Sequence, residues 1–115
     1  MKVKIIVAII ALLALFTVCY SAEIYPSAEK TADALIKTGS GTYGGMIVIT
    51  DATNACTVKV YDNTAASGRV LDDGTCVGAT VTCKYLFPWP ISFDNGVYAD
   101  MTTSGTCTFI IFTNK

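Results

Sequence analysis

The 115-residue chain contains no histidine, and charged residues make up only 15% of it. Without an imidazole the chain has no Ser-His or Cys-His nucleophile, no histidine general base and none of the commonest metal ligand. Eight Lys and Arg residues against nine Asp and Glu residues give no basic surface for nucleic acid. Apolar residues make up 52% of the chain, which is typical of a folded domain rather than of a disordered tail. We therefore expect one domain with no cofactor, no metal and no nucleic-acid partner.

Carboxylates are the catalytic groups that remain, and their positions favour a structural role. Glu23 and Glu29 are the only glutamates. Paired carboxylates hydrolyse glycosides in many enzymes, but aspartate is also common in turns because its side chain accepts hydrogen bonds from nearby backbone. The run Asp72-Asp73-Gly74 lacks the alternating spacing of an EF-hand calcium loop. We expect no enzymatic activity, and we place the following aspartates in or beside turns: Asp62, Asp72, Asp73, Asp94 and Asp100.

Residues 1–22 have the composition of a secretory signal peptide. Met1–Lys4 is basic, and Ile5–Val18 is an almost unbroken apolar run that is shorter than the roughly 20 residues of a membrane-spanning helix. We expect cleavage after Ser21 or Ala22, which leaves a mature protein without a membrane span that is secreted, periplasmic or on the cell surface. A lipid-modified Cys19 and an uncleaved anchor are the alternatives.

Four cysteines follow the leader, and none of them is spaced as C-x-x-C, so neither a thioredoxin-type motif nor a zinc ribbon is predicted. An even number of cysteines in a small exported domain indicates two disulfides. Cys76 and Cys83 flank a short segment that suits a local bridge, which leaves Cys56 to pair with Cys107. The two other pairings of four cysteines remain open.

Alternation of apolar and polar residues predicts strands over most of the chain. Cys56, Val58 and Val60 share one face of the clearest example. We expect Pro88 and Pro90 to end a strand, since proline cannot donate to a central ladder. The pattern predicts a single antiparallel β-sandwich of about seven or eight short strands over 42–115, jelly-roll or immunoglobulin-like, after an N-terminal signal helix. The expected strands are Tyr43–Thr50, Cys56–Tyr61, Arg69–Leu71, Ala79–Phe87, Ile91–Phe93, Val97–Met101 and Thr106–Thr113.

Residues 23–41 form an N-terminal arm that ends in the hinge Gly39-Ser40-Gly41, and Ala28–Ile36 is either a short helical turn or extended. The strand Thr106–Thr113 is apolar on both faces toward its end, so either it is central and covered on both sides or one face is an interface. We expect the arm to cover that surface in its own chain or in a neighbour, and the hinge favours the neighbour.

Trp89 is the only tryptophan, and it lies between Pro88 and Pro90. Its ring either packs over one end of the core, which we favour, or binds a partner protein or a sugar.

The stretch Thr57–Gly68, TVKVYDNTAASG, together with Pro90–Asp100, PISFDNGVYAD, resembles a recurring pattern in small β-sandwich proteins encoded by tailed phages and prophages. The resemblance covers about Thr38 to Phe112, and it implies a virion-surface or fibre-type structural module with no catalytic residues to carry over. The chain departs from the pattern in its leader and its four cysteines, which a protein assembled in reducing cytoplasm does not need.

The sequence thus predicts an exported, disulfide-stabilised, non-enzymatic β-sandwich that acts by assembly or surface interaction. The expected partner is a second copy or another surface protein. The alternatives are a phage virion decoration or fibre-type protein, an extracellular filament subunit, and a carbohydrate-binding module built around Trp89 with a glycan as partner.

Overall fold

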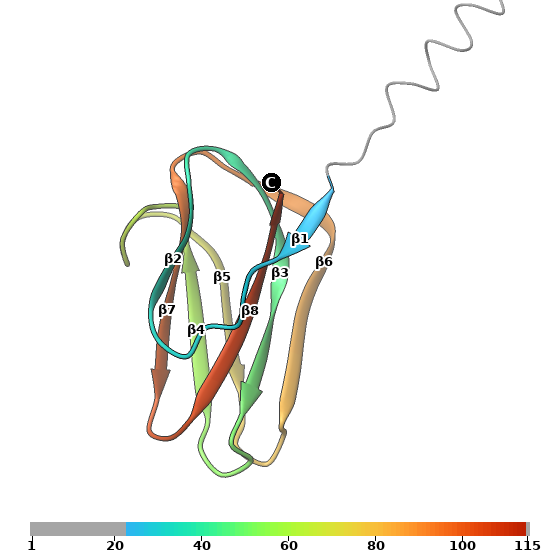
Figure 1. Cartoon of the computed structure of the whole chain (residues 1–115), viewed down its shortest axis with the longest axis vertical. Helices are drawn as coiled ribbons and strands as arrows, with labels where there is room; N and C mark the ends of the chain where they lie inside the picture. Colours follow the sequence, from blue (N-terminus) through green and yellow to red (C-terminus); the bar gives the residue numbers. More distant parts are fainter. Residues whose placement is uncertain (1–22, 115) are drawn as a thin grey trace, which may run out of the picture.

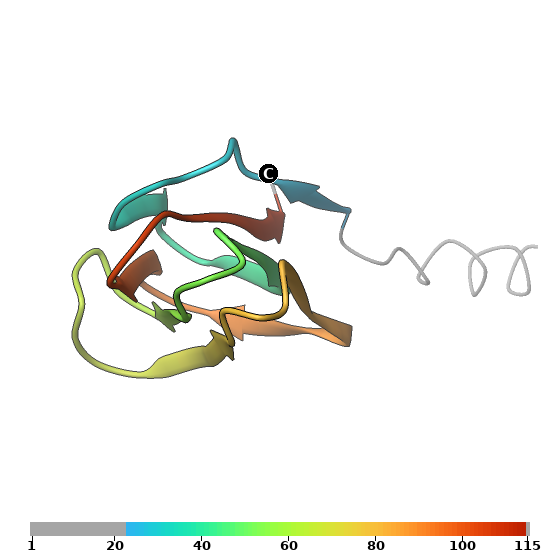
Figure 2. The ribbon, with the colours of Figure 1, turned by 90° about the horizontal axis from the view of Figure 1, so that it is seen from below.

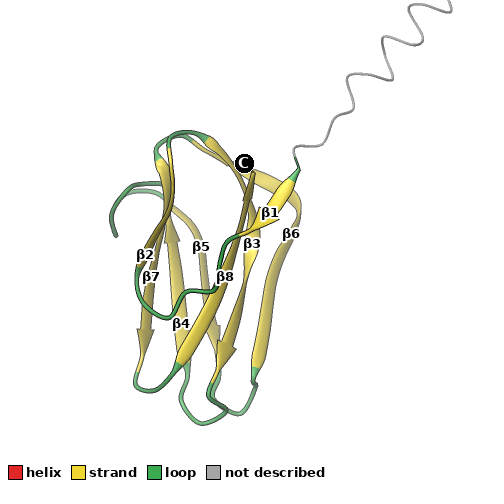
Figure 3. Ribbon diagram, in the orientation of Figure 1, coloured by secondary structure: helices red, strands yellow, loops and turns green. Residues whose placement is uncertain are grey.

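The computed structural model describes residues 23–114, and these form eight β-strands and no helix (Figure 3). The signal peptide predicted over residues 1–22 lies outside the described residues. Within them, no helix is long and apolar enough to cross a membrane. The strands are β1 (Ile24–Pro26), β2 (Ala34–Thr38), β3 (Gly41–Thr50), β4 (Cys56–Tyr61), β5 (Val70–Cys76), β6 (Thr82–Phe93), β7 (Gly96–Thr103) and β8 (Cys107–Asn114).

The eight strands form two antiparallel sheets that pack face to face, which confirms the predicted all-β sandwich (Figures 1 and 2). Sheet A has the order β1-β8-β3-β6, and sheet B has the order β2-β7-β4-β5. The pairs β1·β8, β2·β7, β3·β6 and β4·β5 are those of one long hairpin rolled up so that its two arms wrap around the core. This nesting is the jelly-roll arrangement. An immunoglobulin-like sandwich pairs several consecutive strands within a sheet, whereas among the described residues only β4 and β5 do so.

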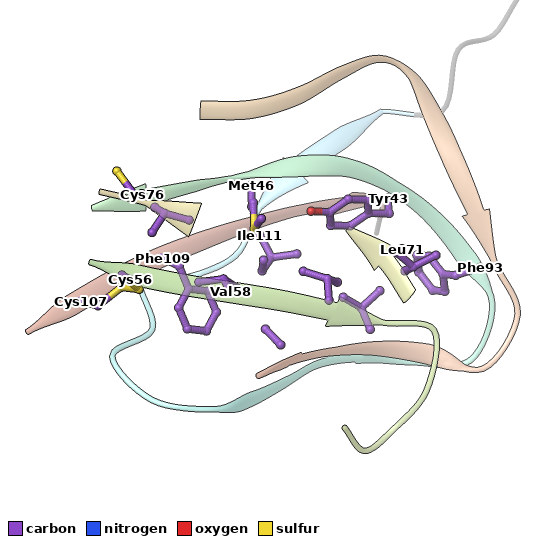
Figure 4. Close-up of a cluster of buried hydrophobic side chains, with 14 residues drawn as sticks. Tyr43, Met46, Cys56, Val58, Leu71, Cys76, Phe93, Cys107, Phe109 and Ile111 are labelled. Atoms are coloured by element: carbon purple, nitrogen blue, oxygen red, sulfur yellow. A yellow bond between two sulfur atoms is a disulfide. The ribbon is translucent and has the colours of Figure 1, made fainter. Parts of the chain in front are cut away.

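The core lies between the two sheets and is built by the strand alternation (Figure 4). Cys56, Val58 and Val60 of β4 are fully buried, as predicted. Phe109 and Ile111 of β8 meet them from sheet A. The other buried apolar side chains of the cluster are Tyr43, Met46, Val48, Leu71, Cys76, Phe93, Val97, Ala99 and Cys107.

Asp72-Asp73-Gly74 does not form the predicted turn, because it lies inside β5. Gly74 is opposite Val58 in the β4–β5 pair. A Cβ at Gly74 would lie 2.6 Å from Met46 Cε and 2.8 Å from Tyr85 Cε2, so the glycine leaves room for two core side chains. Asp100 likewise lies within β7 rather than in a turn.

Pro88 and Pro90 do not end a strand either, since β6 continues through both of them. The Cα partner of Tyr43 is Ile91, but that of Gly45 is Leu86, so residues 87–90 bulge out opposite the single residue Gly44. β6 is an edge strand that is bonded only to β3. Proline is tolerated at an edge or a bulge because its missing N–H is not needed there.

The predicted arm supplies one edge strand to each sheet of its own chain. In β1, Ile24 pairs with Asn114, and in β2, Leu35 pairs with Tyr98. Between these strands, Lys30 forms an isolated bridge to Phe109. The segment is extended rather than helical, because its backbone groups find partners along the edges of β8 and β7. β8 is consequently an interior strand, flanked by β1 and β3.

Two disulfides join the sheets, and they have the pairing that the sequence favoured. Cys56–Cys107 connects β4 to β8, and Cys76–Cys83 connects the edge strands β5 and β6. All four cysteines lie toward the end of the sandwich where β5 ends and β6 and β8 begin. Figure 4 shows Cys56, Cys76 and Cys107 grouped at that end.

Candidate interaction surface

Asp62, the aspartate of the VYDNT stretch, connects two loops at the end of the sandwich opposite the disulfides. Its carboxylate is 3% exposed and accepts hydrogen bonds from the amides of Asp94 (3.0 Å) and Asn95 (2.8 Å). Arg69 donates to the same carboxylate from Nε and Nη2, and its Nη2 also donates to the Ser92 carbonyl. The carboxylate is therefore fully engaged in holding the β4–β5 loop against the β6–β7 turn.

The pKa of Asp62 shows which effect dominates at this site. Burial by itself raises the pKa of a carboxyl group, but the hydrogen bonds from the Asn95 and Asp94 amides and from Arg69 outweigh it, so the pKa lies below its ordinary value. The group is charged at neutral pH and holds the two loops together by hydrogen bonds. We call such a carboxylate a loop clasp.

Asp51 performs the corresponding task at the disulfide end. Its carboxylate accepts hydrogen bonds from the amides of Asn54 (2.7 Å), Thr53 (2.9 Å) and Thr106 (3.0 Å), so it joins the β3–β4 turn to the β7–β8 turn. These bonds, with that from the Asn54 amide the largest contribution, hold the pKa of Asp51 well below its usual range.

Asp72 accepts a hydrogen bond of 2.7 Å from the hydroxyl of Tyr43, which reaches across the core from β3. Burial raises the pKa of Asp72, and burial together with the Asp72 charge raises the pKa of Tyr43 beyond the physiological range. The pair joins the two sheets inside the sandwich. Between residues 23 and 114 no three His, Cys, Asp or Glu side chains come together as a metal-binding group.

The outer face of sheet B is largely polar. Strand register places Thr102, Thr57 and Thr75 in one row across β7, β4 and β5, and the hydroxyls of Thr57 and Thr75 lie 2.8 Å apart. The next row contains Asp100, Lys59 and Asp73, with an ion pair of 3.6 Å between Lys59 and Asp73. A third row, near the Asp62 end, holds Leu35, Tyr98, Tyr61 and Val70.

The outer face of sheet A is mostly apolar. Its rows run across β8, β3 and β6, and they contain Ile110, Ile47 and Lys84 in the first row. The next two rows contain Thr108, Ile49 and Thr82, and then Phe112, Gly45 and Leu86. We call Ile47, Ile49, Leu86, Ile110 and Phe112 the apolar face. None of them belongs to the core cluster or packs against it, because the alternate residues of the same strands fill the core.

The apolar face ends in a groove beside the bulge of β6. The groove has a volume of about 360 Å³, and none of its lining residues has a polar side chain: Ile24, Gly44, Leu86, Phe87, Pro88, Pro90 and Phe112. Ile24 packs closely against Gly44 in this lining, since a Cβ at Gly44 would lie 2.8 Å from a methyl group of Ile24. The groove therefore depends on a glycine in β3 and on a strand from the predicted arm.

Trp89 does not pack over the core, because its side chain is 83% exposed. Phe87 anchors the bulge instead, and its ring lies 6.0 Å from that of the core residue Tyr43. Pro88 and Pro90 line the groove, and Trp89 between them is not one of its lining residues. The interpretation of Trp89 as a core plug is wrong, and its ring is available to a partner.

Only part of this surface can be predicted from the sequence. The sequence predicts that Ile110 and Phe112 lie on a strand that is either covered on both sides or part of an interface. The structure places both on the outer side of an interior strand. Ile47 and Ile49 were not recognised as surface residues, because the run MIVIT reads as a strand covered on both sides. Comparisons of the chain with protein-family models, curated proteins and solved structures found no match.

Proposed function

We propose that this chain is an exported, non-enzymatic structural module that works by binding a protein surface through the apolar face of sheet A. The observation that carries the proposal is the contrast between the two outer faces. Sheet B has a charged row with an ion pair and a row of threonines beside its one apolar row, whereas each of the three rows of sheet A contains at least one apolar side chain and Lys84 is the one charged residue in these rows. A contiguous apolar patch of this kind is typical of an interaction site.

The chemistry of the groove favours a protein over a glycan. A sugar offers hydroxyl groups, and its binding sites combine an aromatic ring with side chains that donate or accept hydrogen bonds. The groove lining contains no polar side chain, and Trp89 is not part of it. An aliphatic or aromatic protein surface fits such a lining because it leaves no polar group unpaired.

Two observations support export. The sequence of residues 1–22 predicts a signal peptide, and the two disulfides suit an oxidising compartment. Both bridges tie sheet A to sheet B, which suits a module that keeps its shape outside the cell.

A virion-surface or fibre-type module is the second candidate. The jelly-roll strand order is compatible with it, since viral capsid domains share this topology with lectins and cupins. The resemblance to phage β-sandwich proteins also centres on the stretch whose aspartate, Asp62, forms the loop clasp.

The proposal is tested by placing a charge on each outer face in turn. Ile47→Lys puts a lysine in the apolar face, and Thr102→Lys puts the same side chain on the exposed outer side of sheet B. We expect wild type and Thr102→Lys to sediment with surface or particle material of the producing culture, and Ile47→Lys to stay in the supernatant. Equal sedimentation of the two variants would contradict the proposal.

A further inference from the structure

We propose that Asn95-Gly96, at the turn between β6 and β7, is a latent site of covalent modification, and that opening of the Asp62 clasp permits succinimide formation there. It is the one Asn-Gly pair among the asparagines of the chain. The site shares no residue with the apolar face, so it is independent of the proposed function.

The reaction needs no reactant other than water. The backbone nitrogen of Gly96 bonds to Cγ of Asn95, the bond from Cγ to the side-chain nitrogen breaks, and the amide proton leaves with that nitrogen as ammonia. Water then opens the succinimide ring at either carbonyl and leaves aspartate or isoaspartate, in which the main chain runs through Cγ. A glycine after the asparagine favours ring closure, because no Cβ hinders the approach of the nitrogen.

Packing keeps a glycine at this position. Gly96 is buried, and a Cβ on it would lie 2.7 Å from the carbonyl oxygen of Lys37 and 3.1 Å from that of Asn63. Asn95 is exposed, so its side chain is accessible to the water that the second step consumes. The turn therefore retains a chemically labile pair, since a larger residue than glycine would displace the backbone around it.

The clasp holds the peptide group that has to move. Asn95 donates its amide to Asp62 (2.8 Å), and its carbonyl oxygen accepts a hydrogen bond from the Gly39 amide (3.0 Å). The Gly96 amide also donates to Asp62, so its N–H bond is directed at that carboxylate. The nitrogen attacks along the direction of this N–H bond, and the planar peptide group turns as a unit. Turning it toward Cγ therefore breaks the hydrogen bonds to Asp62 and from Gly39.

The charge of Asp62 opposes the first step as well. The Gly96 nitrogen must give up its proton before it can attack. A hydrogen bond from the N–H group and a negative charge beside it both favour the protonated amide. The closed clasp thus protects the pair by geometry and by charge.

The modification is one-way. Isoaspartate lengthens the main chain by one carbon, which displaces the amides of residues 95 and 96 from Asp62. Both products also place a new carboxylate near Asp62, where like charges repel. The clasp is consequently weakened in a modified copy, and the modified fraction records how long the two loops have been open.

The experiment incubates the exported protein at mildly alkaline pH and follows Asn95 by peptide mass spectrometry, with electron-transfer fragmentation to distinguish isoaspartate from aspartate. We expect Asp62→Ala to be modified at least about tenfold faster than wild type, because hydrogen bonds to a charged group are lost from the closed turn. Asp51→Ala removes the clasp at the other end of the sandwich and is the matched control, which should keep the wild-type rate. Asp62→Asn retains one acceptor oxygen without the charge, and its rate should lie between those of wild type and Asp62→Ala.

Asp62→Asn also serves as the second variant if Asp62→Ala does not fold. Three results would overturn the inference: wild type modified at Asn95 as fast as the protein unfolded in urea, folded Asp62 variants modified no faster than Asp51→Ala, or modification that occurs at another asparagine instead.

Discussion

At the scale of single residues, the carboxylates of Asp51, Asp62 and Asp72 all accept hydrogen bonds within the protein. The donors are backbone amides, Arg69 and the Tyr43 hydroxyl. Asp62 and Asp51 each accept several amide hydrogen bonds, and each ties together two loops that are far apart in sequence. Asp72 is different, because it faces Tyr43 across the core and keeps a raised pKa. Aspartates of similar appearance in the sequence therefore contribute to stability with opposite dependence on pH.

Replacing Asp62 with alanine should lower the free energy of unfolding by about 2 kcal/mol, because two backbone amides and Arg69 lose their acceptor. Asp94→Ala is the matched control, since the Asp94 side chain is exposed, and its effect should stay within about 0.5 kcal/mol. Urea denaturation at neutral pH measures both. Equal effects of the two substitutions would show that Asp62 is not a clasp.

The lowered pKa of Asp62 also sets the sign of its pH dependence. The unfolded carboxyl group has a pKa of about 3.9 and takes up its proton before the folded one does. The stabilisation is therefore complete at neutral pH and is lost as the pH falls below about 4 and through the folded pKa. Asp62→Ala should lose this acid dependence, which a series of melting temperatures at decreasing pH would reveal.

Asp72→Asn should have the opposite profile. The pKa of Asp72 is raised in the folded state, so its contribution is largest at low pH and is lost as the pH rises through the folded pKa. Asparagine retains an oxygen for the Tyr43 hydroxyl and has no charge to desolvate. We expect the variant to gain stability relative to wild type between pH 4 and pH 7, by less than about 1 kcal/mol because the carboxyl group is half solvated. A constant difference across this range would contradict the expectation.

At the scale of elements, β6 is the strand with the most unusual construction. Its edge position allows two prolines and a bulge in a 12-residue strand, and the bulge separates an anchoring Phe87 from an exposed Trp89. Trp89→Ala should change the free energy of unfolding by less than about 0.5 kcal/mol. Phe87→Ala should cost about 1 to 2 kcal/mol, because its ring contacts Tyr43 from a partly exposed position. Denaturation curves compare the two, and a larger loss for Trp89→Ala would place that ring in the core after all.

Strand boundaries were predictable where local alternation determines them and not where packing does. β4 has the predicted bounds, Cys56–Tyr61, since every second residue enters the core. The sequence predicts chain breaks at Gly74 and at the two prolines, whereas the structure places all three inside strands. Gly74 leaves room for Met46 and Tyr85, and the free edge of β6 tolerates the prolines. Neither cause is local in sequence. The apolar face could not be predicted for the same reason. Only the arrangement of the two sheets shows that its side chains lie on the outside of sheet A and not in the core.

At the scale of the whole molecule, the two ends of the sandwich are held by different kinds of bond. The disulfide end has two covalent bridges and the Asp51 clasp, whereas the other end relies on Asp62, Arg69 and strand pairing. Cys56–Cys107 closes a loop of 51 residues, and Cys76–Cys83 closes one of 7. Loss of the longer bridge should therefore cost more stability.

Replacing Cys56 and Cys107 with alanine should lower the free energy of unfolding by about 4 kcal/mol, and replacing Cys76 and Cys83 should lower it by about 2 kcal/mol, on the chain-entropy relation. Urea denaturation of the two double variants measures the difference, and the reverse order would contradict it. In wild type, alkylation without reductant should leave the mass of the exported protein unchanged.

We expect the mature protein to begin at Ala22 or Glu23, because the sequence predicts a signal peptide that is cleaved after Ser21 or Ala22. Intact-mass measurement of exported material tests this. Recovery of the full-length chain in a membrane fraction would instead support the uncleaved anchor.

The pairing of Ile24 with Asn114 has a mechanical consequence. The two ends of the described chain lie side by side, so tension between them peels β1 from β8 one hydrogen bond at a time and does not shear the two strands past each other. Unzipping of this kind yields at low force. The Cys56–Cys107 bridge then stops it, since only the residues before Cys56 and after Cys107 can be pulled straight. Those are about 40 residues, which extend by roughly 140 Å at about 3.5 Å each. A molecule anchored at both ends would thus lengthen under load like a tether of fixed maximum reach, while the segment between the bridged cysteines bears no tension.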